Sequence, residues 1–187
     1  MDKRKGISMR TRTVAVAAVA GMLVIGGSLP ASAGTSGATT ASVTVTGGSL
    51  SITVPATAAN SGSLGSRVNT FNGGNIAGSL GQVQVEDARS AAAGSGWVTS
   101  VISSAFTGPG GSVAAGQVGY TAGTIGKEGT ATYTANNPAS LVGVAPAVTA
   151  TEITGDNRAT WTPTIDVDVP GGTVAGTYSA TITHSVL

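Results

Sequence analysis

The amino-acid sequence predicts an all-β protein, and three observations lead to this prediction. Residues 176–187 alternate apolar and hydroxyl-bearing side chains, which is the period of a strand with one buried face. Runs rich in β-branched residues recur between glycine-rich turns, and beyond residue 33 no stretch shows the apolar period of a helix. For a single core of this size we expect an antiparallel β-sandwich, Ig-like in arrangement or distorted towards a barrel.

Residues 1–33 have the features of a secretory signal peptide. Basic residues, among them Lys3 and Arg10, precede an uncharged apolar run at 14–25 that we expect to be helical. An Ala-Ser-Ala sequence at 31–33 supplies the small side chains of a cleavage site. We expect cleavage after Ala33, secretion, and no membrane span in the mature chain. The alternative is an uncleaved membrane anchor, because residues 13–29 also carry no charge.

Removal of this segment changes the charge of the protein. Five of the 9 basic residues and one of the 8 acidic residues lie within 1–33, so residues 34–187 have a net charge of −3. A weakly acidic domain without a cluster of Lys and Arg argues against a nucleic-acid partner. The chain contains no cysteine, so its stability must come from packing rather than from disulfide bonds.

We expect residues 34–41 to form a flexible leader and residues 42–187 to form the folded domain. The first predicted element is a hairpin of two strands, joined by Gly47 and Gly48. A loop-like region follows, and then two strands separated by a turn of small residues at 90–96. The strands predicted in this half of the domain span residues 42–46, 49–55, 81–87 and 97–103.

The second half of the domain is predicted to end in two well-defined strands. In the first of these, Trp161 and Val167 fall on one face, and Pro163 requires an edge position or a bulge because it has no N–H to donate. In the closing strand, the apolar face contains the only histidine of the chain, His184. The strands predicted in this half span residues 113–120, 129–134, 147–153, 158–169 and 176–187.

Catalytic and metal chemistry have little support in the sequence. His184 lies mid-strand without a nucleophile-elbow pattern nearby, so we expect a structural histidine, no enzyme and no cofactor. Asp166 and Asp168 project on one side of their strand, about 7 Å apart, and Asp156 precedes them, so a calcium site is conceivable. A solvated outward face is the favoured interpretation of these aspartates.

Two groups of residues are candidates for ligand binding. Asp87 and Arg89, beside Glu86, lie at a strand end, where a structural ion pair is the default and a binding role is the alternative. The aromatic residues Trp97, Trp161 and Tyr178 combine apolar area with a polar tip. Such side chains suit either a sandwich core or a platform for the apolar faces of sugars.

Three segments, in this order, resemble the WxL domain family of bacterial surface proteins. They are Val85-Glu-Asp-Ala-Arg89, then Gly96-Trp97-Val98-Thr99, and finally Gly176-Thr-Tyr-Ser-Ala-Thr-Ile-Thr-His-Ser-Val186. In that family an Asp-x-Arg strand end precedes a first Trp-x-Leu, and a Gly-x-Tyr strand leads into a second. Here the first motif keeps Trp97 but lacks the Leu, and the second falls on His184-Ser185-Val186 without its Trp.

The resemblance implies a secreted, extracellular domain that attaches non-covalently to the bacterial cell wall, through peptidoglycan or an attached polymer. Trp97 with Asp87 and Arg89 is then the first candidate patch, and Trp161 and Tyr178 are further candidates. His184 stands where related domains carry the second Trp, which implies a position in the core. The alternative function is an adhesion or assembly subunit, in which a sheet edge or a Thr-rich face pairs with another surface protein.

Overall fold

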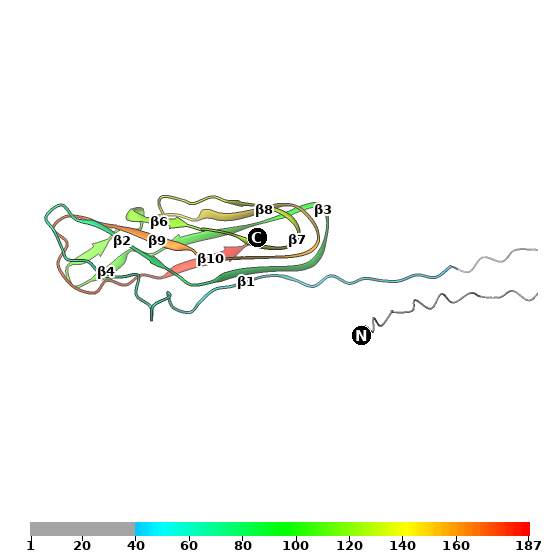
Figure 1. Ribbon diagram of the computed structural model, residues 1–187, viewed down its shortest axis with the longest axis horizontal. Coiled ribbons are helices and arrows are strands. Elements are labelled where there is room, and N and C mark those ends of the chain that lie inside the picture. The colour runs from blue at the N-terminus through cyan, green and yellow to red at the C-terminus, as the bar shows by residue number, and fades with distance from the viewer. Residues whose placement is uncertain (1–39) are drawn as a thin grey trace, which may run out of the picture. The chain divides into compact units, whose positions relative to one another are not determined.

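The computed structural model describes residues 40–187, so the predicted signal peptide at 1–33 and residues 34–39 of the predicted leader lie outside the described residues. Residues Val43–Leu187 form one compact unit. This unit is all-β, as predicted, with antiparallel strands and a single short 3-10 helix, η1 (Ala115–Gln117), in the described part (Figure 1). Over the same residues, no helix has the length and hydropathy needed to cross a membrane.

The strands form two sheets and a small hairpin. The larger sheet has the order β1-β3-β8-β7, and β10 also pairs with β3. The smaller sheet has the order β2-β9-β6, and β4 pairs with β5. The strands are β1 (Leu50–Thr53), β2 (Gly74–Ser79), β3 (Val83–Ser103), β4 (Phe106–Gly108), β5 (Gly111–Val113), β6 (Val118–Thr121), β7 (Gly126–Ala135), β8 (Ala145–Trp161), β9 (Thr164–Val169) and β10 (Ile182–Val186).

The long antiparallel pair β3 and β8 is the spine of the larger sheet. The strands predicted at 81–87 and 97–103 are parts of β3, so the predicted turn at 90–96 is wrong. The register with β8 shifts three times between Asp87 and Trp97, which marks a series of bulges. Ser90 (φ 53°) and Gly94 (φ 86°) adopt the left-handed conformation there, so the small residues bend a strand instead of ending it.

Strands β1 and β10 both pair with the same edge of β3, β1 with its first part and β10 with its last part. The predicted first hairpin is wrong, because residues 42–46 are not in a strand and β1 pairs with the first part of β3. Instead of turning back at the glycine pair, the chain follows β3, and the Gly48 N–H donates to the Ala88 carbonyl. As a result Val43 and Val45 have no neighbouring strand, and their exposed fractions are 89% and 78%.

The predicted strand at 158–169 is divided between the two sheets. Strand β8 ends at Trp161 and β9 begins at Thr164, so Pro163 lies where the chain crosses from the larger sheet to the smaller one. Because Pro has no N–H, it interrupts the ladder at this crossing. The predicted alternation is confirmed, with Trp161 and Val167 buried. Similarly, η1 divides the predicted strand at 113–120.

The closing strand is shorter than predicted, but its alternation is confirmed. Regular pairing with β3 begins at Ile182 rather than at Gly176, although Ser179 forms an isolated bridge with Thr107. The inward positions are half-buried and the outward ones exposed. The inward side chains are those of Tyr178, Ala180, Ile182, His184 and Val186.

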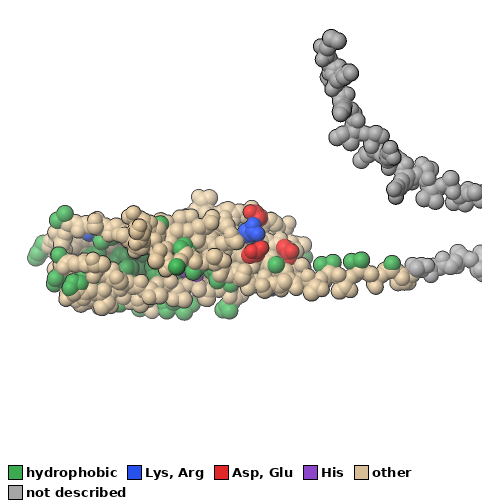
Figure 2. Space-filling model, turned by 90° about the horizontal axis from the view of Figure 1, so that it is seen from below, with side chains coloured by type: hydrophobic (Ala, Val, Ile, Leu, Met, Phe, Trp, Pro, Cys, Tyr) green, Lys and Arg blue, Asp and Glu red, His purple; other side chains and the backbone are tan. Residues whose placement is uncertain are grey.

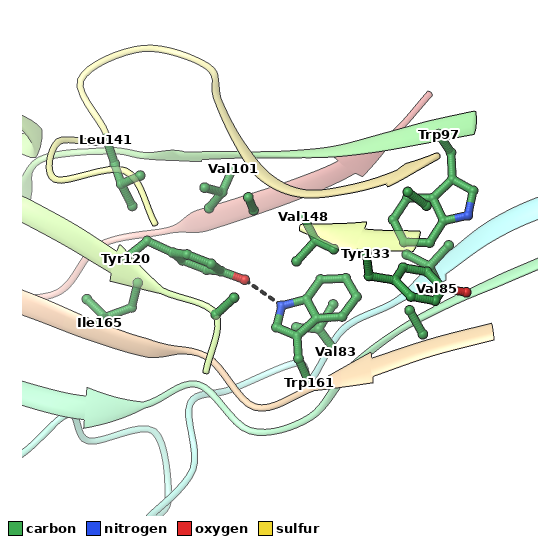
Figure 3. Close-up of a cluster of buried hydrophobic side chains, with 14 of the residues drawn as sticks. Val83, Val85, Trp97, Val101, Tyr120, Tyr133, Leu141, Val148, Trp161 and Ile165 are labelled. Carbon is green, nitrogen blue, oxygen red and sulfur yellow. Dashed lines mark hydrogen bonds between the residues drawn. The ribbon is translucent and has the colours of Figure 1, made fainter. Parts of the chain in front are cut away.

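The core lies between the two sheets and is tied by a hydrogen bond across them. The Trp161 indole Nε1–H of β8 donates to the Tyr120 hydroxyl of β6 at 2.7 Å, with both rings buried (Figure 3). A buried indole N–H needs such an acceptor, because an unpaired polar group inside a protein is costly. This bond fixes the relative position of the sheets at the centre of the domain.

We expect Tyr120→Phe to lower the free energy of unfolding by about 1–2 kcal/mol, since it leaves the Trp161 indole N–H without an acceptor at nearly unchanged volume. Urea unfolding followed by tryptophan fluorescence measures this change. Tyr178→Phe is the matched control, because the Tyr178 hydroxyl donates to the exposed Val174 carbonyl. Its removal should lower the free energy of unfolding by less than about 0.5 kcal/mol. Equal effects of the two variants would contradict the assignment.

Candidate functional site

The first candidate site brings together Asp87, Arg89 and Trp97, as the sequence suggested. Asp87 points inward from β3, with the same parity as Val83 and Val85. Arg89 donates from Nε to Asp87 Oδ1 at 2.8 Å and from Nη2 to Oδ2 at 2.9 Å, which is a bidentate ion pair. These hydrogen bonds from Arg89 hold the pKa of the Asp87 carboxyl below its usual value.

Asn157 of β8 extends this ion pair into the core. Its Nδ2 donates to Asp87 Oδ2 at 3.2 Å. Its Oδ1 accepts from Trp97 Nε1 and from the Tyr133 hydroxyl, both at 3.1 Å. The Trp97 and Tyr133 rings also pack with centroids 5.7 Å apart. The five side chains therefore form one connected polar network in which each buried group has a partner.

The burial of this network corrects its predicted role as a ligand patch. Trp97 has an exposed fraction of 2% and Asp87 of 0%, so neither offers a surface to a sugar. Arg89, whose side chain is 38% exposed, is the member that reaches solvent. Trp161 is also 2% exposed. For both tryptophans the structure therefore supports the core interpretation, and the Asp87–Arg89 pair is structural.

The remaining charged residues lie mostly at the surface. Arg158 pairs with Glu86 at 3.1 Å and with Glu128 at 3.2 Å, and charged side chains gather in one exposed group in Figure 2. Asp166 and Asp168 are exposed on β9, where Asp166 accepts a hydrogen bond from the Asn75 amide.

Asp156 belongs to β8, in the other sheet, and accepts hydrogen bonds from the N–H and hydroxyl of Ser90. The three aspartates considered for calcium therefore do not converge. Over the described residues, no three His, Cys, Asp or Glu side chains form a group able to hold a metal ion.

The second candidate site is a cleft of about 820 Å³ between the two sheets. Its walls are β10 and β4 on one side, β2 and β9 on the other, and the loops at 54–69 and 173–181. Hydrophobic side chains are exposed within the hollow on the face shown in Figure 2. The larger apolar side chains of the lining are those of Leu64, Ile76, Leu80, Phe106, Val167 and Ile182.

The rim of this cleft is polar but almost uncharged. The two loops supply hydroxyl groups at several positions, together with the Asn69 amide, and Arg67 is the charged side chain in the lining. The lining contains no Asp or Glu. The hydroxyl-bearing residues are Thr57, Ser61, Ser63, Ser66, Thr173, Thr177, Ser179 and Thr181.

Two aromatic side chains, Tyr178 and Phe71, reach solvent at the cleft or beside it. Tyr178, a candidate from the sequence, lines it and donates a hydrogen bond to the Val174 carbonyl at 2.9 Å. Phe71 is 94% exposed and is not part of the lining, although Asn69 and Gly73 on either side of it are. Within the cleft, accessible aromatic surface therefore comes from Tyr178, and Trp97 contributes none.

His184 lines the cleft from β10 and touches the core behind it. Its Nε2 lies 3.4 Å from the Tyr120 hydroxyl, and the two rings meet edge to face with centroids 5.6 Å apart. Burial lowers the pKa of His184 to about 4 and raises the pKa of Tyr120 to about 12. Both groups are therefore uncharged at neutral pH, and this part of the cleft is electrically neutral.

Sequence reasoning missed Asn157 and Phe71. Asn157 shares its parity with the buried Ala159 and Trp161, so a polar residue on the inward face of a strand was the available signal. Phe71 lies in a loop, where no periodic pattern indicates whether a side chain is buried.

Comparison of the chain with protein-family models, with curated proteins and with solved structures found no match. We therefore infer function from the chemistry of the two sites and from the sequence patterns.

Proposed function

We propose that this protein is a non-catalytic surface domain that associates with the bacterial cell wall by holding a stretch of peptidoglycan, or of an attached polymer, in the cleft. The observation that carries the proposal is the composition of the cleft, which has apolar walls, a hydroxyl-rich rim and no acidic side chain in its lining. Sugar rings present apolar faces and hydroxyl edges, so a neutral glycan matches both parts of this lining. The resemblance of the sequence to WxL domains suggests the same class of partner.

The side chains of the cleft support binding better than hydrolysis. Glycoside hydrolysis commonly requires two carboxyl groups flanking the bond that is broken. The titratable side chains in the lining are those of Arg67, Tyr178 and His184, and His184 is uncharged at neutral pH because of its burial. Asp87 is engaged in the buried network. A neutral cleft of this kind is suited to retaining a polymer.

We expect the protein, expressed from the full 187-residue sequence, to be retained on insoluble cell-wall sacculi. Tyr178→Ser should weaken retention about 10-fold, because it removes an aromatic ring of the lining worth roughly 1.4 kcal/mol of stacking on a sugar. A co-sedimentation isotherm measures the change. Phe71→Ser is an aromatic control, because this ring is 94% exposed but lies outside the lining, so retention and the melting temperature should both be unchanged.

Val142→Ser is a second control, because Val142 is highly exposed, at 75%, and does not line the cleft. This variant should bind like the unmodified protein. Sacculi stripped of their attached polymers by acid, used beside intact ones, distinguish peptidoglycan from those polymers as the ligand. A folded protein that sediments with neither preparation would overturn the proposal.

A further inference from the structure

Residues 42–46 form an extended segment with the character of a strand but no strand partner. Their sequence, Ser-Val-Thr-Val-Thr, alternates hydroxyl-bearing and apolar side chains, and both apolar ones, Val43 and Val45, are exposed, at 89% and 78%. β-branched residues in alternation favour a pleated, half-buried surface. Exposure of the valines leaves the apolar face of this segment uncovered.

Strand β7 presents a sheet edge with a matching pattern. It is the last strand of the larger sheet, paired with β8 on one side. In its second half, Thr130, Thr132 and Thr134 are exposed, whereas Tyr133 is buried and Ala131 is half-buried. Lys127 and Glu128 lie in the first half, and charges of this kind protect an edge from pairing, but residues 130–135 carry none. The register with β8 shifts at Gly129/Thr130 and at Thr130/Thr132, so the regular and uncharged part of this edge is residues 132–135.

The segment and this edge are complementary in period and in chemistry. A strand formed by residues 42–46 beside residues 132–135 would place Val43 and Val45 on the face that contains Tyr133, and its hydroxyl groups on the face of the β7 threonines. Pairs of an aromatic with a β-branched residue, and pairs of threonines, are favourable across strands. Neither partner carries a charge, so the pairing has no ionic cost.

The segment cannot reach the β7 edge of its own domain. Gly48 is fixed beside β3 by its hydrogen bond to Ala88, at the β1 side of the sheet. A strand added to the free edge of β7 would lie four strand spacings away from β1, which is about 19 Å at the usual spacing of 4.8 Å between strands. The two residue steps from Gly48 to Thr46 span only about 7 Å. The strand that covers this edge must therefore come from a second copy.

We propose that residues 42–46 of one copy add as a strand to the exposed edge of β7 in a second copy. The donor and the acceptor are different surfaces of the molecule, so the contact is heterologous and can repeat from copy to copy. It generates head-to-tail chains rather than a dimer. This self-assembly uses the β7 edge and not the cleft, and it goes beyond the proposed binding of wall polymers.

Sedimentation velocity of the full-length product over a range of concentrations tests the proposal. We expect a concentration-dependent series of oligomers, which the double variant Val43→Lys, Val45→Lys reduces to monomer. The double variant Val142→Lys, Val144→Lys is matched in charge and in exposure, because these valines are 75% and 70% exposed, and it should assemble normally. A protein that is monomeric throughout, a closed dimer, or equal loss of assembly in both variants would each overturn the proposal.

Cross-linking locates the contact, and the absence of native cysteine makes it specific. An equal mixture of Val43→Cys and Thr132→Cys chains should give a disulfide-linked heterodimer in excess of either homodimer. Thr181, which is exposed and lines the cleft, provides the site control. Preferential cross-linking of Val43→Cys to Thr181→Cys would place the segment in the cleft and overturn the assignment to β7. Retention on sacculi, measured on the Lys variants, reports separately on the proposed function.

Discussion

Asp87→Ala is expected to lower the free energy of unfolding by about 3 kcal/mol. The Asp87 carboxylate accepts three hydrogen bonds from Arg89 and one from Asn157. Its removal leaves the buried Asn157 amide without an acceptor and the Arg89 guanidinium without its counter-charge. Because the Arg89 side chain reaches solvent, water can hydrate its guanidinium once the Asp87 carboxylate is gone. The loss of stability should therefore be smaller than the largest losses seen when a fully buried ion pair is broken. Urea unfolding at neutral pH measures the change.

Two comparisons make this result specific. Asp168→Ala removes an exposed carboxylate and should change stability by less than about 0.5 kcal/mol. The pKa of Asp87 is lowered in the folded state by its hydrogen bonds to Arg89, so its contribution is present above the usual value of 3.8 and is lost as the pH falls below it. The difference between the unmodified protein and Asp87→Ala should therefore shrink below pH 3.8. A difference of under 0.5 kcal/mol at pH 7 would contradict the role of the network.

The free energy of unfolding should fall by about 3 kcal/mol as the pH is lowered from 6.5 to 4, because of His184 alone. Burial lowers the pKa of His184 from 6.5 to about 4 in the folded state. Between these values the unfolded chain binds a proton that the folded chain does not, so stability is complete above pH 6.5 and is lost as the pH approaches 4. Urea unfolding at half-unit pH intervals measures this dependence.

His184→Gln is the control for this pH dependence, since glutamine is polar but does not titrate. Tyr120, which faces His184, stays neutral because its pKa is about 12, and Asp87 titrates only below 3.8. The slope of stability against pH between 6.5 and 4 should therefore be smaller in His184→Gln than in the unmodified protein. Parallel curves for the two proteins would show that His184 is not held neutral by the fold.

The parts of the fold that depend on local periodicity could be predicted from the sequence. The alternation of the closing strand and the parity of Trp161 and Val167 follow from the period of two, which requires no knowledge of the partner strand. The first hairpin could not be predicted correctly, because whether residues 42–46 pair depends on β3, some forty residues further along. The bulges of β3 were missed for the same reason, as small residues suit both a turn and a bulge.

The candidate sites were predictable to a smaller extent. The proximity of Asp87, Arg89 and Trp97 depends on the bend of β3 at its bulges, because ten residues of a straight strand would separate Asp87 from Trp97 by about 33 Å. Their burial depends on Asn157, which joins them from β8 across 70 positions of sequence. The cleft arises where the loops at 54–69 and 173–181 meet, and neither loop has a periodic pattern. Long-range contacts, rather than motifs, therefore decide which aromatic side chains remain accessible.

The arrangement of β1 and β10 along one edge of β3 has a consequence for any fibre that this protein forms. Gly48 is hydrogen-bonded to Ala88 of β3, and Leu187 is hydrogen-bonded to Val98 of the same strand. Both ends of the folded unit therefore lie on the side of the sheet opposite the β7 edge. Chains built by strand addition at β7 would continue the larger sheet of one copy, through the donated strand, towards the next copy. Their diffraction should show the spacing of about 4.8 Å between paired strands.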